Sequence, residues 1–400
     1  MKASHILKEC FLATCIILLV TFFVKKIPIS NEFRKAIFQG FGDFDIYDLH
    51  YSGNKDEKKS FDENIVLVEI GTDRSEIADQ LDLINRYNPK VIGIDAVFES
   101  PGDELLDYKF KETIKGKTNL IFASRFIDTP KQKVITPFFK QGEHENGYAN
   151  FIGNKYSVNR MYPPSTVVNG KHHDAFTTAI AKRFNLKSYT RLRNRNNDRE
   201  LIHYKGNLER YLSITKDDLK YYDTTNQLTE IFEDKIVLLG FFVKQDSARQ
   251  TPLILDDLHY SPMNEIVFGK SYPDMYGVVI HANILSMILS GNYANLASDT
   301  VTYLFAFFLT ALFYYYIFSQ YKKTAHPNHG KLMLVQYLGI VILLYLFLQL
   351  FDLFLYKTPL EPILIALVLS LELMVLYKIA ALWLHKKFGY KTVFSLKHDI

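Results

Sequence analysis

Three long stretches with almost no charge constrain the fold of this chain most strongly. They are residues 301–320, 332–351 and 360–384. The first two contain no charged side chain, and the third contains only Glu361, Glu372 and Lys378. A helix of ~20 apolar residues crosses the ~30 Å hydrocarbon core of a membrane, so each stretch predicts a transmembrane helix. A fourth apolar segment, Cys10–Val24, is shorter and reaches spanning length if the flanking lysines extend to the interfaces.

Lysine distribution predicts the orientation of these helices. The 321–331 loop and the residues after Leu384 are rich in lysine, whereas the 352–359 loop contains only Lys357. Loops rich in Lys and Arg stay in the cytoplasm, so both termini are expected to be cytoplasmic. We predict a multi-pass protein of the bacterial inner (plasma) membrane. Its expected parts are a cytoplasmic N-terminus with a transmembrane anchor (1–28), an extracytoplasmic domain (29–298), a three-helix bundle (299–384) and a short basic tail (385–400).

The middle region has the pattern of an α/β domain. Residues 65–70 form a continuous apolar run, an amphipathic segment follows from Asp73 to Tyr87, and 91–94 is a second apolar run after Pro89. Strand, helix and strand over about 30 residues predict a βαβ unit and hence a parallel sheet. We therefore expect a mixed, largely parallel sheet with flanking helices.

Further elements are expected along the same region. Helices are predicted over 103–115, 176–184 and 278–289, and strands over 120–124, 201–204 and 236–240. Residues 148–151 and 158–161 are expected to pair around a turn, the arginine-rich run 191–199 to be a solvated loop, and 249–275 to be an irregular insertion. The 278–289 helix is expected to lead, after Gly291, directly into the second transmembrane helix.

Several of these segments resemble the CHASE2 extracellular sensory domain of bacterial receptors. The resemblance rests on six ordered pieces: Ile65–Ile70 with Asp73 and Ser75, Pro89–Asp95 with Phe98, Gly147–Asn150, Val158–Arg160, Lys235–Gly240 with Thr251-Pro252, and Gly277–Asn283. It implies a sensory function and a layout with one helix before the domain and often three after it. Family members usually continue into a cytoplasmic cyclase or kinase. Only about 16 residues follow Leu384 here, so we expect no output domain in this chain.

Three aspartates form the predicted ligand site. Asp73 and Asp95 each follow the carboxyl end of a predicted strand, and Asp246 follows the 236–240 strand. Ligands bind at this edge of open α/β sheets, where three carboxylates could hold a cation, an amine or a polyhydroxyl compound. The alternatives are structural: Asp73 with Glu76 also fits a helix N-cap, and Asp95 could make only structural hydrogen bonds.

Two further residues are candidates for relaying a signal. His281 lies early in the last soluble helix and could act as a pH-sensitive group, or could be a helix histidine whose hydrogen bonds are satisfied. Glu372 lies near the centre of the last predicted span. It is expected to face the bundle interior, where Tyr345 could hydrogen-bond to it, either as a switch or partner contact or as a polar fastener between helices.

The remaining sequence patterns limit the classes of function that we expect. The formal net charge of +4 does not indicate a nucleic-acid-binding protein. His172 and His173 are adjacent and lack a spaced partner, so we expect no metal site, and we expect no cofactor and no catalytic motif. The leading hypothesis is a membrane sensor that binds an unknown extracytoplasmic ligand and signals to a separate cytoplasmic or membrane protein. A homodimer is one expected form, since receptors of this layout are often dimers. The alternatives are an envelope scaffold without a small ligand and an envelope enzyme that uses Asp73, Asp95 and Asp246.

Overall fold

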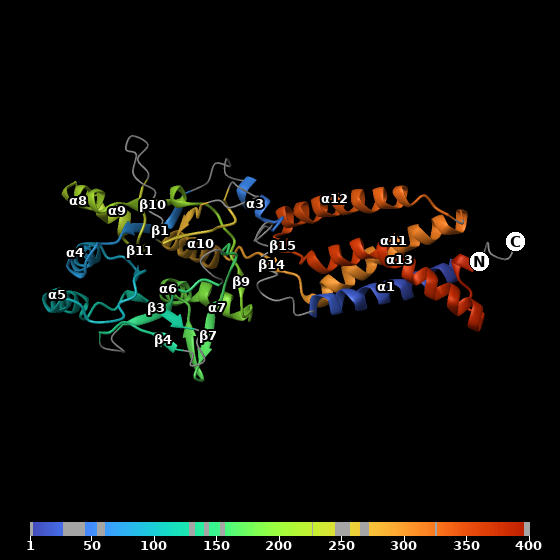
Figure 1. The fold of residues 1–400 in the computed structure, drawn as a ribbon. Helices are drawn as coiled ribbons and strands as arrows, with labels where there is room; N and C mark the ends of the chain where they lie inside the picture. Colours follow the sequence, from blue (N-terminus) through green and yellow to red (C-terminus); the bar gives the residue numbers. More distant parts are fainter. Residues whose placement is uncertain are drawn as a thin grey trace. The chain divides into compact units, whose positions relative to one another are not determined.

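The computed structural model describes residues 3–26, 45–53, 61–127, 133–139, 144–152, 157–225, 227–244, 257–264, 272–324 and 326–395. The chain forms two compact units (Figure 1). One comprises Met1–Gly40 and Asn295–Ile400 and is helical, and the other comprises Phe41–Ala294 and is mixed α/β. Asp246 and Thr251-Pro252 lie outside the described residues.

A largely parallel sheet forms the centre of the α/β unit. Its described strands have the order β10-β1-β11-β2-β3-β4, with β5 also paired to β3. Every pairing is parallel except that of β3 with β4. The strands are β1 (Asp62–Glu69), β2 (Val91–Ile94), β3 (Leu120–Ile127), β4 (Lys133–Ile135), β5 (Glu145–Tyr148), β10 (Tyr211–Ile214) and β11 (Ile236–Gly240). The predicted α/β class and mixed, largely parallel sheet are confirmed.

Helices cover both faces of this sheet. Val66 and Val68 of β1 form one core with the helices α4 (Arg74–Asn85), α5 (Glu104–Ile114), α8 (Lys216–Thr224) and α9 (Leu228–Phe232). The helices α6 (Phe176–Phe184) and α10 (Gly277–Ser290) pack on the opposite face. Burial on both faces explains why the central strands are continuous apolar runs in the sequence rather than alternating ones.

Close approach of α10 to the sheet depends on Gly240 at the end of β11. A Cβ atom at this position would lie 2.6 Å from Cβ of Val278, a distance shorter than real Cβ contacts. The absence of a side chain lets the first turn of α10 rest on the carboxyl end of β11. Residues Gly277 to Ile288 of α10 are all buried.

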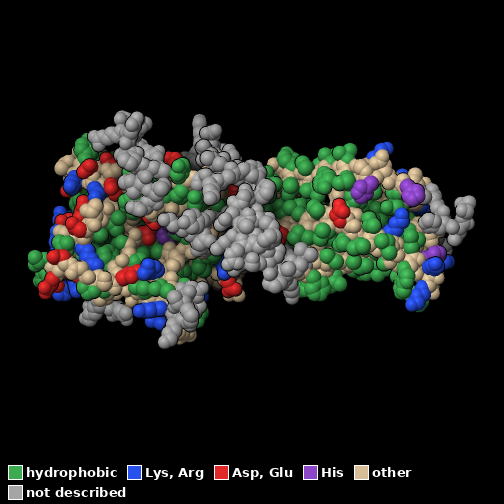
Figure 2. Space-filling view, viewed as in Figure 1, with side chains coloured by type: hydrophobic (Ala, Val, Ile, Leu, Met, Phe, Trp, Pro, Cys, Tyr) green, Lys and Arg blue, Asp and Glu red, His purple; other side chains and the backbone are tan. Residues whose placement is uncertain are grey.

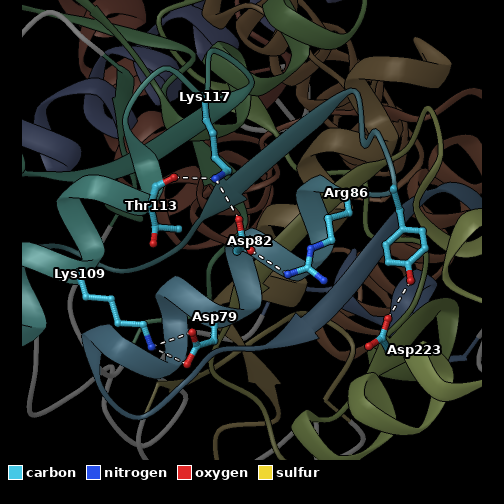
Figure 3. Close-up of polar contacts among 8 residues, drawn as sticks. Asp79, Asp82, Arg86, Lys109, Thr113, Lys117 and Asp223 are labelled. Carbon is cyan, nitrogen blue, oxygen red and sulfur yellow. Dashed lines mark hydrogen bonds and ion pairs between the residues drawn. The ribbon is translucent and has the colours of Figure 1, made fainter.

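Charged side chains join α4 and α5 on the outer side of this layer (Figure 3). Nζ of Lys109 lies 2.7 Å from the Asp79 carboxylate, and Asp82 lies between Arg86 (2.9 Å) and Lys117 (3.5 Å). Most of these side chains are largely exposed, and exposed pairs of this kind stabilise a protein by ~0–1 kcal/mol each. The network is therefore a solvated surface feature rather than a binding site.

Short elements complete the α/β unit and correct two predictions. They are α3 (Asp48–Gly53), α7 (Leu186–Asn194), η2 (Leu208–Arg210) and the strand pairs β6 (Met161–Tyr162) with β9 (Glu200–Leu201), β7 (Ser165–Val168) with β8 (Lys171–Asp174), and β12 (Leu258–His259) with β13 (Met275–Tyr276). The predicted pairing of 148–151 with 158–161 is wrong, because β5 joins β3 and β6 joins β9. Local sequence indicates an extended segment but not which distant segment completes its hydrogen bonds.

The arginine-rich run is not simply a solvated loop. Arg191 and Arg193 lie on α7, and Arg191 donates hydrogen bonds to the carbonyls of Ile288 (3.0 Å) and Leu289 (2.9 Å). These carbonyls belong to the last turn of α10, where a cation satisfies unpaired acceptors and complements the helix dipole. The interpretation of this run as a loop was therefore wrong for residues 191–194, which are helical, and Arg191 stabilises the end of α10.

The helical unit contains α1 (Ala3–Lys26), α11 (Asp299–Lys323), α12 (His329–Phe354) and α13 (Glu361–Phe388). All four are long and apolar enough to cross a membrane, and Figure 2 shows hydrophobic side chains over most of the visible surface of this unit. Helices α1, α11 and α13 pack against one another, and α12 packs against α13. The short strands β14 (Asn295–Leu296) and β15 (Tyr356–Lys357) pair with each other.

The segment after α13 packs against the helices of its own unit. Residues Val393–Ser395 form a 3-10 turn, η3, and Val393 and Phe394 are buried against side chains of α1, α11 and α13. The backbone N–H of Val393 donates to the Glu9 carboxylate on α1 (2.9 Å). Residues 389–395 therefore close one end of the helical unit rather than extending from it.

Helix α10 ends before Gly291 as predicted, but it does not lead directly into α11. Gly291 adopts the left-handed conformation (φ 71°), and its N–H donates to the carbonyl of Met287. This conformation of Gly291 terminates α10. Ser298 then caps the start of α11. Residues 291–298 separate the two helices along the chain, so these helices do not form one continuous rod.

Candidate ligand-binding site

Asp95 lies at the carboxyl edge of the parallel sheet, one residue beyond β2. Its backbone N–H donates to the carbonyl of Leu239 on β11 (2.8 Å), which extends the strand pairing to this residue. The carboxylate is only 14% exposed. The βαβ topology therefore places a mostly buried acidic side chain at the edge where α/β domains bind ligands.

His281 of α10 faces Asp95. Nε2 of His281 lies 3.8 Å from Oδ1 of Asp95, which is close for an electrostatic interaction but too long for a hydrogen bond. Burial raises the pKa of the Asp95 carboxyl well above its ordinary value, and the neighbouring Asp257 raises it further. Burial lowers the pKa of the His281 imidazole to about 3, with a smaller contribution from His259. Both shifts favour the uncharged forms of this pair.

Aromatic rings enclose His281 and leave one of its ring nitrogens without a partner. Phe151 stacks on the imidazole with ring centroids 4.8 Å apart, and Phe176 meets its edge at 5.3 Å. Within the described part of the chain, the buried Nδ1 of His281 has no hydrogen-bond partner. The described residues therefore do not supply the hydrogen bond to Nδ1 that the alternative of a satisfied helix histidine requires.

A second acid–histidine pair lies beside the first. Nε2 of His259 lies 3.4 Å from Oδ1 of Asp257, and the His259 ring meets Phe151 at 5.0 Å. The Asp257 carbonyl accepts a hydrogen bond from the N–H of Gly277 (3.1 Å), and its carboxylate lies over this first residue of α10. A helix N-terminus stabilises such a negative charge.

The predicted three-carboxylate site is not assembled as expected. Oδ1 of Asp73 accepts a hydrogen bond from the backbone N–H of Glu76 (2.8 Å) and caps α4, which supports the structural alternative. Asp73 follows β1, and β11 separates that strand from β2 and Asp95. Among the described residues, no hydrogen bond or ion pair joins the Asp73 and Asp95 carboxylates. Asp246 lies outside the described residues.

Sequence reasoning missed Asp257 and His259. Both fall in the 249–275 stretch that was interpreted as an irregular insertion. The signal available was the alternation Asp257-Leu258-His259, since side chains two residues apart in a strand point to the same side. No group of three His, Cys, Asp or Glu side chains that could hold a metal ion occurs among the residues that the structure describes.

Glu372 of the helical unit lies differently from expectation, and a second acidic residue is buried there. Glu372 is exposed on α13 rather than facing the bundle interior, and Tyr345, its expected hydrogen-bond partner, is also exposed. Glu9 of α1, which sequence reasoning missed, is only 1% exposed. The rotation of a helix about its axis decides which of its side chains face inward, and neighbouring helices set that rotation.

Comparisons with known proteins support one family. The model of the CHASE2 domain matches residues 43–315, which is more than half of the chain. The matched range includes β2, α10 and the residues of both acid–histidine pairs. No curated protein and no solved structure matches the chain.

Proposed function

The chain belongs to the CHASE2 family of sensory extracellular domains, and we propose that it is a membrane-bound sensor that relays ligand binding to a separate protein. The α/β unit would lie outside the cytoplasm and the four apolar helices would cross the membrane with both termini in the cytoplasm. The lysine-rich 321–331 loop supports this orientation. The chain would act as a receptor rather than as an enzyme.

The buried Asp95–His281 pair carries the proposal, because Nδ1 of His281 has no hydrogen-bond partner among the described residues. A buried polar group without a hydrogen-bond partner costs ~1–3 kcal/mol, so a native protein keeps one where it has a use. A ligand that donates a hydrogen bond or a positive charge to Asp95, and that pairs with Nδ1 of His281, would recover this cost. An amine or a polyhydroxyl compound has the required donors. Phe151 and the adjacent Asp257–His259 pair add an apolar face and a second acidic group.

Chain connectivity supports the proposed relay. Helix α10 carries His281, and only residues 291–298 separate its end from α11. In the helical unit α11 packs on both α1 and α13. A shift of α10 on ligand binding would therefore act on the helix that contacts two other membrane-spanning candidates.

A thermal-unfolding screen of the full-length protein in detergent micelles tests the ligand site. The panel contains monoamines, diamines, amino acids, sugars and polyols. A ligand at ~100 times its dissociation constant stabilises the folded state by ~2.7 kcal/mol. We expect a panel member to raise the melting temperature of the wild type and of Asp73→Asn, but not that of Asp95→Asn. Asp73→Asn is the matched control because asparagine also caps helices well.

Three results would speak against the proposal. A melting-temperature shift of equal size in Asp95→Asn would place the ligand elsewhere. Stable co-purification of envelope proteins that no panel member alters, together with no shift in the wild type, would favour an envelope scaffold. Turnover of a panel compound that depends on Asp95 would favour the acidic-site enzyme.

A further inference from the structure

Glu372 lies at mid-depth of the last apolar helix. It is eleven residues after Glu361 and sixteen before Phe388, the two ends of α13. At a rise of 1.5 Å per residue it is ~16 Å from the first end and ~24 Å from the second. The hydrocarbon core of a membrane is ~30 Å thick, so the short glutamate side chain reaches neither interface.

The carboxylate belongs to an exposed stripe of α13. Val368, Glu372, Val375, Ile379 and Trp383 follow one another at spacings of four, three, four and four residues, and all five are exposed. This spacing places them on one face of the helix, here named the Glu372 stripe. The buried positions of α13, which face its own unit, are Pro362, Ile363, Ala366, Leu367, Ser370, Leu371, Met374 and Ala381. Within the described residues, no hydrogen bond or ion pair reaches Glu372.

A carboxylate in contact with lipid tails is unfavourable unless another group covers it. Lys378 contacts the Tyr321 and Phe394 rings at 5.4 and 5.9 Å, on a different part of α13. The other lysines in the four described spanning helices lie within about two turns of a helix end. The described helices of a second copy of this chain therefore offer no free cation at the depth of Glu372. Charge complementarity favours a different protein.

We propose that the Glu372 stripe docks a transmembrane helix of a different membrane protein, one that carries a lysine or arginine at mid-depth. The apolar side chains of the stripe would pack on that helix, and the Glu372 carboxylate would pair with its cation. This inference rests on the proposed relay and deepens it, because it assigns the surface through which the separate partner is reached.

Synthetic helices test the charge preference of the stripe directly. The full-length protein, labelled with a fluorescent donor, is reconstituted in vesicles of phosphatidylethanolamine and phosphatidylglycerol. Acceptor-labelled Leu–Ala peptides of about 20 residues carry Lys, Leu or Glu at their centre. Energy transfer reports association. We expect the Lys peptide to associate roughly tenfold more tightly with the wild type than the Leu peptide does, as one interhelical polar contact allows.

Variants separate the carboxylate from the rest of the stripe. Glu372→Gln should remove the preference for the Lys peptide. Val375→Trp keeps the carboxylate but obstructs the stripe, and should weaken association. Leu338→Trp, at an exposed position of α12, is the matched control and should leave association unchanged. Circular dichroism of each variant confirms that it is folded.

Three outcomes would overturn the proposal. They are equal binding of the Lys peptide to the wild type and Glu372→Gln, equal binding of the Lys and Leu peptides to the wild type, and Glu372-dependent self-association of the labelled protein. The assay requires no ligand of the outer domain. Its failure therefore leaves the Asp95 test unaffected, and failure of the Asp95 test leaves this one unaffected.

Discussion

In the wild type, Asp95 and His281 should make opposite contributions to the pH dependence of the free energy of unfolding. Substitution of one residue should leave the contribution of the other measurable. Between pH ~4 and 6.5 the unfolded pair carries one proton, on the histidine. The folded pair also carries one proton, because burial raises the pKa of Asp95 and lowers that of His281 to about 3. Equal proton counts mean that this pair contributes no slope to wild-type stability in this range.

Asp95→Asn should reveal the contribution of His281 to the pH dependence of stability. The unfolded histidine then binds a proton below pH 6.5 that the folded one does not, so stability falls as the pH decreases. One pH unit corresponds to 1.36 kcal/mol, so the variant should lose about 2.7 kcal/mol between pH 6.5 and 4.5 relative to the wild type. His281→Phe should show the opposite sign, because Asp95 alone is then protonated in the folded state and ionised in the unfolded state. Its stability should fall as pH rises from about 4 to the folded pKa of Asp95.

Urea unfolding followed by circular dichroism, at several pH values in detergent micelles, measures these slopes. Asp257 and His259, which shift the pKa values of Asp95 and His281, are kept in every variant. The double variant Asp95→Asn, His281→Phe should again lack a slope from this site. Parallel pH profiles for Asp95→Asn and the wild type would refute the reasoning, since they would mean that His281 is solvated or paired in the folded protein.

Three further predictions concern packing and capping. Asp73→Ala should lower the free energy of unfolding by ~1 kcal/mol while Asp73→Asn changes it by a few tenths, and equal losses in urea unfolding would contradict a capping role. Glu9→Ala should speed hydrogen exchange at the Val393 amide roughly tenfold, whereas Glu9→Gln retains an acceptor and should stay near the wild type. Gly240→Ala should cost ~1–3 kcal/mol through a clash with Val278, and Val278→Ala in the same chain should restore part of that loss in the same assay.

Local patterns predicted the elements that depend on local interactions. The apolar runs at 65–70, 91–94 and 236–240 became β1, β2 and β11, and the helix after Asp73 begins where its cap was predicted. These predictions were correct because strand burial and helix capping involve residues that are close in the sequence. The pairing of residues 158–161 failed because their partner, β9, is about 40 residues away.

The sequence by itself determined four apolar helices, a βαβ-containing sheet and membership of the CHASE2 family. Only the tertiary structure decided that Asp257 and His259 stand beside Asp95 and His281. It also decided that Glu9 is buried while Glu372 is exposed. Composition and periodicity indicate the secondary structure that each segment forms. The rotation of a helix, and the meeting of residues more than 150 positions apart, depend on packing between distant segments that local sequence does not encode.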